Sequence, residues 1–282
     1  MNDIVENREM KVIFGDARNM AEIPSSSIHL VVTSPPYWKM RGLLVWKDYN
    51  EYTVAMKTVL KEIFRVLKTG RVACINIGDY LDTEEGHKYP LVADFIKWGQ
   101  ELGFRYEDMI IWVKPFGAGT SSGSGGSGKR AGNFIKYGFS LYFRPNNRWE
   151  AIIIFRKGEI NYETYPVDKR PIADWRVLHQ YLGDVWEFPC ATRIANDDSA
   201  CHPAEFPEIL PDLCIQFYSL PGETVLDPFL GSGTTIRSAI RLKRYGVGYE
   251  INPEYKHYIE RKLLLSNTRL YDFEANYVEA ER

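Results

Sequence analysis

The sequence predicts an α/β protein built on a doubly wound, mainly parallel sheet of seven strands. Short apolar segments alternate with amphipathic helical patterns along most of the chain, which is typical of parallel sheets. Several apolar segments stop at proline, glycine or an acidic residue, as expected where a strand leaves a sheet. The expected strands are 11–14, 28–33, 72–77, 105–114, 150–157, 224–228 and 245–250. Ligands of such sheets bind outside the carboxyl ends of the strands, so residues there are the first candidates for a site.

Two strands of the N-terminal part lead into residues that can contact a ligand. The strand 11–14 is followed by Gly15-Asp16. The strand 28–33 must end at Ser34-Pro-Pro-Tyr37, because neither proline has an N–H to offer a neighbouring strand. A third strand end carries Asp79, which either faces a pocket or caps the following turn.

Helical patterns fill most of the intervals between strands. Gly70 and Gly103 are the expected stops of the first two helices, because glycine commonly ends a helix. The strand 150–157 follows an irregular insertion, and we expect it to pair antiparallel at one side of the sheet. The expected helices are 51–68, 89–102, 205–218 and 253–265, with a further one directly after Thr235.

Composition places the chain among ordinary globular proteins. It has 282 residues, 45% of them hydrophobic and 26% charged, with a formal net charge of −2. No apolar run approaches the ~20 residues of a membrane span, and the N-terminal residues do not resemble a signal peptide, so we expect a cytoplasmic protein without membrane attachment. The four cysteines show no Cys-x-x-Cys spacing, and Cys201 beside His202 does not make a metal pair, so no metal site is expected.

The organisation of the chain follows from changes in composition. A stretch of glycine and serine at 117–128 is too poor in apolar residues to hold a core, and both a native loop and an engineered linker are compatible with it. Basic, aromatic and amide residues follow it, a mixture suited to gripping phosphates and reading bases. The expected segments are 1–115, a flexible and basic-aromatic loop at 116–148, a return strand at 149–158, a small polar and irregular region at 159–200, and a last segment at 201–282.

The stretch after strand 28–33 offers a chemically distinctive set of groups. Ser34 supplies a hydroxyl, Pro35 and Pro36 supply carbonyls that no neighbouring strand needs, and Tyr37 supplies an aromatic face. This set suits a planar heterocycle with an exocyclic amine, whose N–H groups need acceptors and whose ring can stack. The alternative is a proline turn with a packed tyrosine.

A second motif lies after strand 224–228. Gly231 and Gly233 predict a tight turn where the backbone can approach a ligand, and Thr234 or Thr235 caps the next helix. Glu250 ends the following strand about 19 residues after Gly231, the placement at which a carboxylate binds ribose hydroxyls. No Gly-Lys-Ser/Thr follows to bind β- and γ-phosphates, which favours a nucleoside without a phosphate tail as the ligand. Asp227 beside the turn would suit an ammonium group.

Together the two motifs resemble those of the DNA amino-methyltransferases that use S-adenosyl-L-methionine, in the circularly permuted group whose catalytic motif precedes its cofactor motif. The resemblance implies a Rossmann-like methyltransferase fold and transfer of a methyl group to a base flipped out of double-stranded DNA. Its catalytic motif matches Ser34, Pro35, Pro36 and Tyr37. The expected cofactor-binding residues are Asp16, Asp227, Phe229, Gly231, Ser232, Gly233, Thr234 and Glu250.

In this family a serine at the first motif position usually accompanies methylation of cytosine at N4, whereas aspartate or asparagine accompanies adenine N6. Cytosine is therefore the expected target base and adenine the alternative. More remote alternatives are an RNA methyltransferase, a nucleotide-dependent oxidoreductase and a non-catalytic DNA-binding subunit. The resemblance implies that 1–115 is the catalytic half, 201–282 the cofactor-binding half, 116–148 a DNA-contacting loop and 159–200 a small target-recognition region. A homodimer and a companion restriction endonuclease would be compatible with the small recognition region. The expected DNA contacts are Lys39, Arg41, Lys129, Arg130, Lys136, Arg144 and Arg148, and the loop 38–50 is expected to cover the site.

Overall fold

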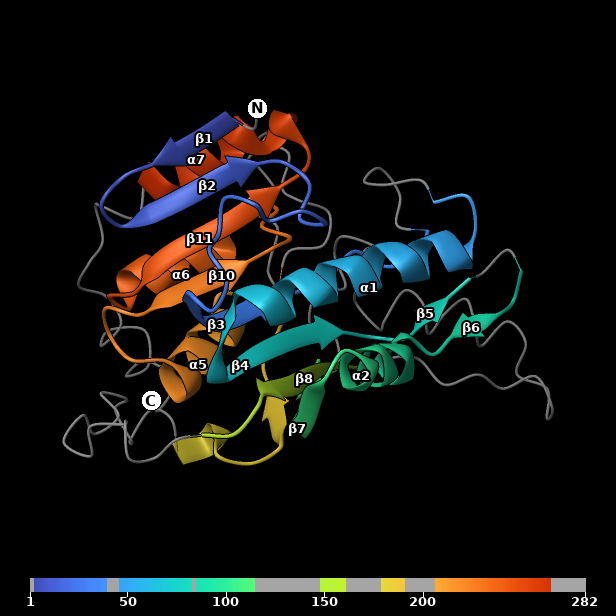
Figure 1. Cartoon of the computed structure of the whole chain (residues 1–282). Coiled ribbons are helices and arrows are strands. Elements are labelled where there is room, and N and C mark those ends of the chain that lie inside the picture. Colours follow the sequence, from blue (N-terminus) through green and yellow to red (C-terminus); the bar gives the residue numbers. More distant parts are fainter. Residues whose placement is uncertain are drawn as a thin grey trace.

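The computed structural model describes residues 3–39, 46–82, 85–114, 148–160, 179–190 and 206–264. These residues form one large sheet with helices on both of its faces (Figure 1). The expected loop 116–148 and recognition region 159–200 lie mostly outside the described residues. No helix in the described part of the chain has the length and apolar character needed to cross a membrane.

The large sheet contains all seven expected strands and two short ones that sequence patterns did not indicate. Five central strands are parallel, and the strand at 149–157 runs antiparallel to both of its neighbours. Strand β1 pairs antiparallel with β2, and β9 pairs parallel with β7. The order across the sheet is β1 (Asp3–Glu6), β2 (Met10–Phe14), β11 (Tyr245–Glu250), β10 (Thr224–Asp227), β3 (Ile28–Thr33), β4 (Leu67–Ile77), β8 (Trp149–Lys157), β7 (Phe104–Val113) and β9 (Val185–Glu187). A separate small hairpin joins β5 (Tyr80–Leu81) and β6 (Lys88–Tyr89).

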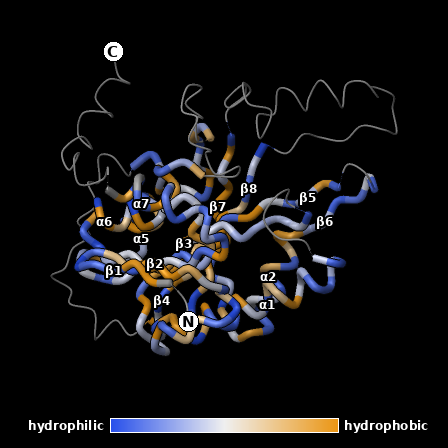
Figure 2. The backbone as a smooth tube through the Cα atoms, turned by 90° about the horizontal axis from the view of Figure 1, so that it is seen from above, coloured by the Kyte–Doolittle hydropathy of each residue, from blue (hydrophilic) through white to orange (hydrophobic). Residues whose placement is uncertain are grey.

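The helices cover the two faces of the sheet in separate groups, as Figure 1 shows. On one face lie α1 (Tyr49–Val66) and α2 (Leu91–Glu101). Their buried residues form one hydrophobic core with the residues of β3, β4 and β8 that point to this face. On the other lie α5 (Ile209–Tyr218), α6 (Thr234–Arg241) and α7 (Lys256–Leu264). Short 3₁₀ turns occur at His179–Tyr181 and Pro253–Tyr255. Figure 2 shows hydrophobic residues gathered along the central strands and hydrophilic ones toward the periphery.

The expected helix 51–68 differs from the observed one at its end. Helix α1 ends at Val66 and β4 begins at the next residue, so the prediction that Gly70 stops the helix is wrong. Gly70 instead lies inside β4 with a φ of 80°. The pairing of β4 with β3 is irregular there, and an added Cβ would approach the Glu159 carbonyl oxygen to 2.9 Å. The glycine is therefore required by a bulge in a strand.

The strand order brings the two sequence motifs together. Strands β11 and β10 lie between β2 and β3, and Val225 pairs with Leu30. Because β10 and β3 are parallel neighbours, the residues that follow them leave the sheet at the same edge. The residues after β3, where the Ser-Pro-Pro-Tyr motif begins, and the glycine-rich turn after β10 therefore share one cleft, as expected from the sequence.

Candidate active site

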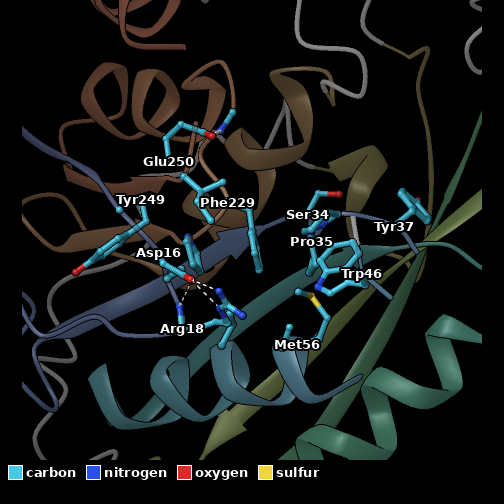
Figure 3. Close-up of a pocket in the computed structure, with 18 of the residues that line it drawn as sticks. Asp16, Arg18, Ser34, Pro35, Tyr37, Trp46, Met56, Phe229, Tyr249 and Glu250 are labelled. Atoms are coloured by element: carbon cyan, nitrogen blue, oxygen red, sulfur yellow. Dashed lines mark hydrogen bonds and ion pairs between the residues drawn. The ribbon is translucent and has the colours of Figure 1, made fainter. Parts of the chain in front are cut away.

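A pocket lies at the carboxyl ends of β2, β11, β10 and β3, with α1 along one side (Figure 3). Four strand ends and one helix thus contribute to a single site. The lining residues are Gly15, Asp16, Ala17 and Arg18 after β2; Ser34, Pro35, Pro36 and Tyr37 after β3; Trp46 and, on α1, Glu51, Ala55, Met56 and Val59; Pro228, Phe229 and Gly231 after β10; and Tyr249, Glu250 and Ile251 at the end of β11.

The Ser-Pro-Pro-Tyr motif is held in place by contacts from behind the pocket. The hydroxyl of Tyr52, on α1, donates to the carbonyl of Pro36 at 3.1 Å. The backbone N–H of Gly78 donates to the hydroxyl oxygen of Tyr37 at 3.0 Å. Burial and the nearby carboxylate of Glu150 raise the pKa of Tyr37 well above its ordinary value, so the phenol stays neutral. The carbonyl of Pro36 and the hydroxyl of Tyr37 therefore already have partners within the protein.

Glu250 lies at the opposite end of the pocket, with Phe229 between it and Ser34 (Figure 3). Its two carboxylate oxygens accept hydrogen bonds from the backbone N–H groups of Gly231 and Asn252, each at 2.8 Å. Burial raises the pKa of Glu250 to about 7. Each oxygen keeps a further lone pair, so the carboxylate can still accept from a ligand's hydroxyl groups.

Asp16 lines the pocket beside β2. Its side chain accepts from the backbone N–H of Arg18 at 2.9 Å and from Arg18 Nε at 2.7 Å, so the two residues form a closed pair. Burial alone would raise the pKa of Asp16, but the hydrogen bonds and charge of Arg18 outweigh it and hold the pKa below its usual value. Asp16 therefore presents an ionised carboxylate at this end of the pocket.

Asp227 does not line the pocket, which corrects its expected role as a ligand for an ammonium group. Its carboxylate is 1% exposed and accepts from the hydroxyls of Thr33 at 2.5 Å and Thr235 at 2.6 Å, and from the N–H of Phe229 at 3.0 Å. Burial raises the pKa of Asp227 to about 6. These contacts join β3, β10 and the start of α6, so Asp227 organises the turn that carries Phe229 instead of facing a ligand.

The remaining residues of the glycine-rich turn, Ser232, Gly233 and Thr234, are not among those that line the pocket. Ser232 and Thr234 hydroxyls lie 3.3 Å apart, and the ammonium of Lys262, on α7, donates to both at 3.1 and 2.8 Å. Gly233 has a φ of 92° and begins α6 against the side chains of α7. A ligand in the pocket would therefore contact this turn at Gly231, whereas Ser232, Gly233 and Thr234 support it from the back.

Several lining residues had no clear signal in the sequence. Glu51, Met56 and Val59 belong to a helix whose apolar spacing indicated burial but not which face meets a ligand. Trp46 lies in the loop expected to cover the site, and it does line the pocket. Trp38, in the same loop, is instead buried at 3% exposure.

Most of the expected DNA contacts, namely Arg41, Lys129, Arg130, Lys136 and Arg144, lie outside the described residues. Lys39 is placed, and its ammonium pairs with the carboxylates of Asp82 at 2.6 Å and Glu85 at 2.7 Å. Two carboxylates already balance its charge, which disfavours a contact with DNA phosphate. Arg148 donates to the carbonyl of Lys114 at 3.3 Å.

Two other expectations concern acidic and metal-binding groups. Asp79 accepts from the N–H of Val92, in the first turn of α2, at 3.3 Å, so this bond goes to a later helix and not to the turn that directly follows β4. Asp79 is not among the residues that line the pocket. Within the described ranges, no three His, Cys, Asp or Glu side chains gather in a way that could hold a metal ion.

Comparisons with known proteins agree with the geometry of the site. The sequence model of a family described as DNA methylase, covering both N6 and N4 types, matches residues 28–261. The chain is 33% identical over 322 residues to the type II methyltransferase M.MjaI of Methanocaldococcus jannaschii, covering 98% of each chain.

Two solved structures show the same fold. A protein of Thermus thermophilus, solved in complex with S-adenosyl-L-methionine, aligns with a TM-score of 0.68 and 29% identity over 89% of this chain and 93% of its own. The cytosine-N4-specific PvuII DNA methyltransferase aligns with a TM-score of 0.69 over 94% of this chain and 93% of its own, and its 21% identity supports the likeness of fold alone.

Proposed function

Since this chain belongs to the DNA methylases of the N6 and N4 amino-methyltransferase family, we propose that it methylates the exocyclic N4 amine of cytosine in double-stranded DNA, with S-adenosyl-L-methionine as the methyl donor. The observation that carries the choice of cytosine is Ser34, whose hydroxyl lines the pocket at the first position of the catalytic motif. A hydroxyl can donate to the ring N3 of cytosine, whereas an ionised carboxylate at this position could not.

The residues that line the pocket fit this cofactor. Glu250 would hold the ribose hydroxyls and Asp16 the adenine edge, because both are carboxylate residues that line the pocket. Phe229 supplies an apolar wall between the two ends of the pocket. When bound, the cofactor supplies an electrophilic methyl group on a sulfonium sulfur.

The chain's own residues would prepare the amine for attack. The exocyclic amine of cytosine is a weak nucleophile because its lone pair is delocalised into the ring. Hydrogen bonds from its N–H groups to Ser34 Oγ and to the carbonyl of Pro35 would favour a pyramidal nitrogen aimed at the methyl group. Tyr37 would contact the base with its ring, since its hydroxyl already binds Gly78. The nitrogen gains the methyl group and releases one proton, and no covalent intermediate with the protein forms.

The test is a product analysis. Purified protein is incubated with unmethylated genomic DNA and S-adenosyl-L-methionine labelled in its methyl group, the DNA is digested to nucleosides, and the label is located by mass spectrometry. We expect label in N4-methylcytosine, and none with Ser34→Ala. Label only in N6-methyladenine would keep the family chemistry and overturn the assignment of cytosine. A homodimer and a companion endonuclease stay predictions for separate measurements of mass and genetic context.

A further inference from the structure

The carboxylate of Glu150 contacts both the catalytic motif and a residue next to it. Glu150 is near the start of β8, which runs antiparallel to β4 and pairs Ala151 with Ile77. Its Oε2 accepts from the amide of Asn76 at 2.9 Å. The side chain also lies beside Tyr37, since a Cβ added to Gly78 would meet Glu150 Cγ at 3.0 Å and the Tyr37 hydroxyl oxygen at 3.2 Å. Its Oε1 accepts from the ammonium of Lys114. One half-buried carboxylate thus joins strands β4, β7 and β8 to the residues that follow β3.

The contact with Glu150 determines how the Asn76 amide is turned. Asn76 is 2% exposed, and its Nδ2 lies 2.9 Å from Glu150 and 3.5 Å from Ser34 Oγ, which is the long limit of a hydrogen bond. Its Oδ1 is buried and has no hydrogen-bond partner among the described residues. Turning the amide over would place that oxygen against the carboxylate, where two acceptors repel. A buried acceptor without a partner destabilises the fold, and such costs concentrate at functional sites.

This orientation has a consequence for Ser34. An N–H group of Asn76 faces Ser34 Oγ, so the serine oxygen acts as the acceptor on that side. Its own proton is then available on the pocket side, where a base would lie. Tyr37 accepts from the N–H of Gly78, and the nearby charge of Glu150 helps to raise its pKa.

We propose that Glu150, with its charge balanced by Lys114, is a positioning residue for methyl transfer: it turns the Asn76 amide toward Ser34, so that the Ser34 hydroxyl is presented to the target base as a donor. The inference rests on the proposed role of Ser34 and extends the site beyond the residues that line the pocket. Glu150 itself is not among the residues that line the pocket.

The first experiment compares Glu150→Gln with the wild-type protein. Glutamine has the same size, but it cannot accept from Asn76 and Lys114 together, because its amide nitrogen is a donor. We expect kcat to fall by about 10- to 100-fold, the scale set by slight misplacement of reacting groups. The affinity for S-adenosyl-L-methionine, measured by calorimetry, should stay within about twofold, since Glu150 lies outside the pocket lining. Glu159→Gln is the matched control, because Glu159 pairs with Arg105 on the surface. The kcat of this variant should equal that of the wild type.

A double-mutant cycle separates positioning from general support of the fold. If Glu150 acts through Asn76, the loss caused by Glu150→Gln should shrink by about fivefold or more in an Asn76→Ala background. If the two substitutions instead reduce kcat by independent factors that multiply in the double variant, the inference is wrong. It is also wrong if Glu150→Gln weakens cofactor affinity or leaves kcat unchanged. A wild-type protein that methylates no base would instead refute the proposed function, so the two failures are distinguishable.

Discussion

The pKa of Glu250 leads to a quantitative prediction for cofactor binding. Burial raises this pKa to about 7, and the nearby charge of Asp227 adds to the effect. Only the ionised carboxylate can accept from two ribose hydroxyls while it also accepts from Gly231 and Asn252. With a pKa of about 7, roughly one eleventh of the protein is ionised at pH 6 and roughly ten elevenths at pH 8. The affinity for S-adenosyl-L-methionine should therefore increase about tenfold from pH 6 to pH 8, or about 1.4 kcal/mol.

The assay is titration calorimetry at pH 6, 7 and 8 with the wild-type protein and with Glu250→Gln. The glutamine of this variant cannot ionise, so we expect it to bind the cofactor more weakly at every pH. The part of the pH dependence of its affinity that comes from position 250 should be less than about twofold from pH 6 to pH 8. The amino group of the cofactor titrates near the upper end of this range, but it does so equally with both proteins, so their difference isolates Glu250. A wild-type affinity that does not change with pH would refute the reasoning, and so would an equal tenfold change in Glu250→Gln.

Three further predictions concern the residues that support the site. Burial raises the pKa of Asp227 from 3.8 to about 6. The stability that its protonated form contributes is therefore complete below pH 3.8 and is lost as the pH rises through 6. Between pH 5 and 8, the free energy of unfolding measured in urea should fall by about 1.4 kcal/mol more in the wild type than in Asp227→Asn. Gly248→Ala would place a Cβ 2.8 Å from the side chain of Leu230, so we expect a loss of about 1–3 kcal/mol and a lower melting temperature, and an unchanged one would contradict the close packing. Tyr52→Phe removes the hydroxyl that donates to the Pro36 carbonyl and keeps the ring. Steady-state kinetics should show kcat reduced about three- to tenfold with unchanged cofactor affinity. An equal loss in cofactor affinity would contradict this, because it would show that the hydroxyl supports the whole pocket.

Sequence patterns predicted the central strands and the two motifs, because strand ends carry strong local signals such as Pro-Pro and Gly-x-Gly. They predicted several residues that line the pocket, Ser34 and Glu250 among them, but did not separate these from strand-end residues that are turned elsewhere. Asp227 and Glu250 both end strands, yet Asp227 is turned to Thr33 and Thr235 while Glu250 faces the cleft. That difference depends on which strands lie side by side and on the alternation of side chains within each, information that only the assembled sheet contains.

The misplaced helix stop and the missed lining residues have a similar origin. Gly70 is a plausible end for a helix, but pairing of Leu67 with Ile28 draws the chain into β4 three residues earlier. Met56 and Val59 belong to an apolar stripe that sequence spacing assigns to the core, and a stripe wide enough to cover a sheet can also border a cleft. Glu150 had no signal as a site residue, because its significance comes from Asn76 across the β4–β8 pair.

The position of β10 and β11 between β2 and β3 also bears on how the protein folds during synthesis. The ribosome releases β2 and β3 early, but each needs a neighbour that is made near the end of the chain, since Met10 pairs with Gly246 and Leu30 with Val225. Until then both strands have bare edges, and such edges bind other chains readily. Contacts so distant in sequence also form slowly. A nascent chain of this enzyme therefore passes through a long aggregation-prone interval, and its catalytic cleft closes only when the two late strands insert into the middle of the sheet.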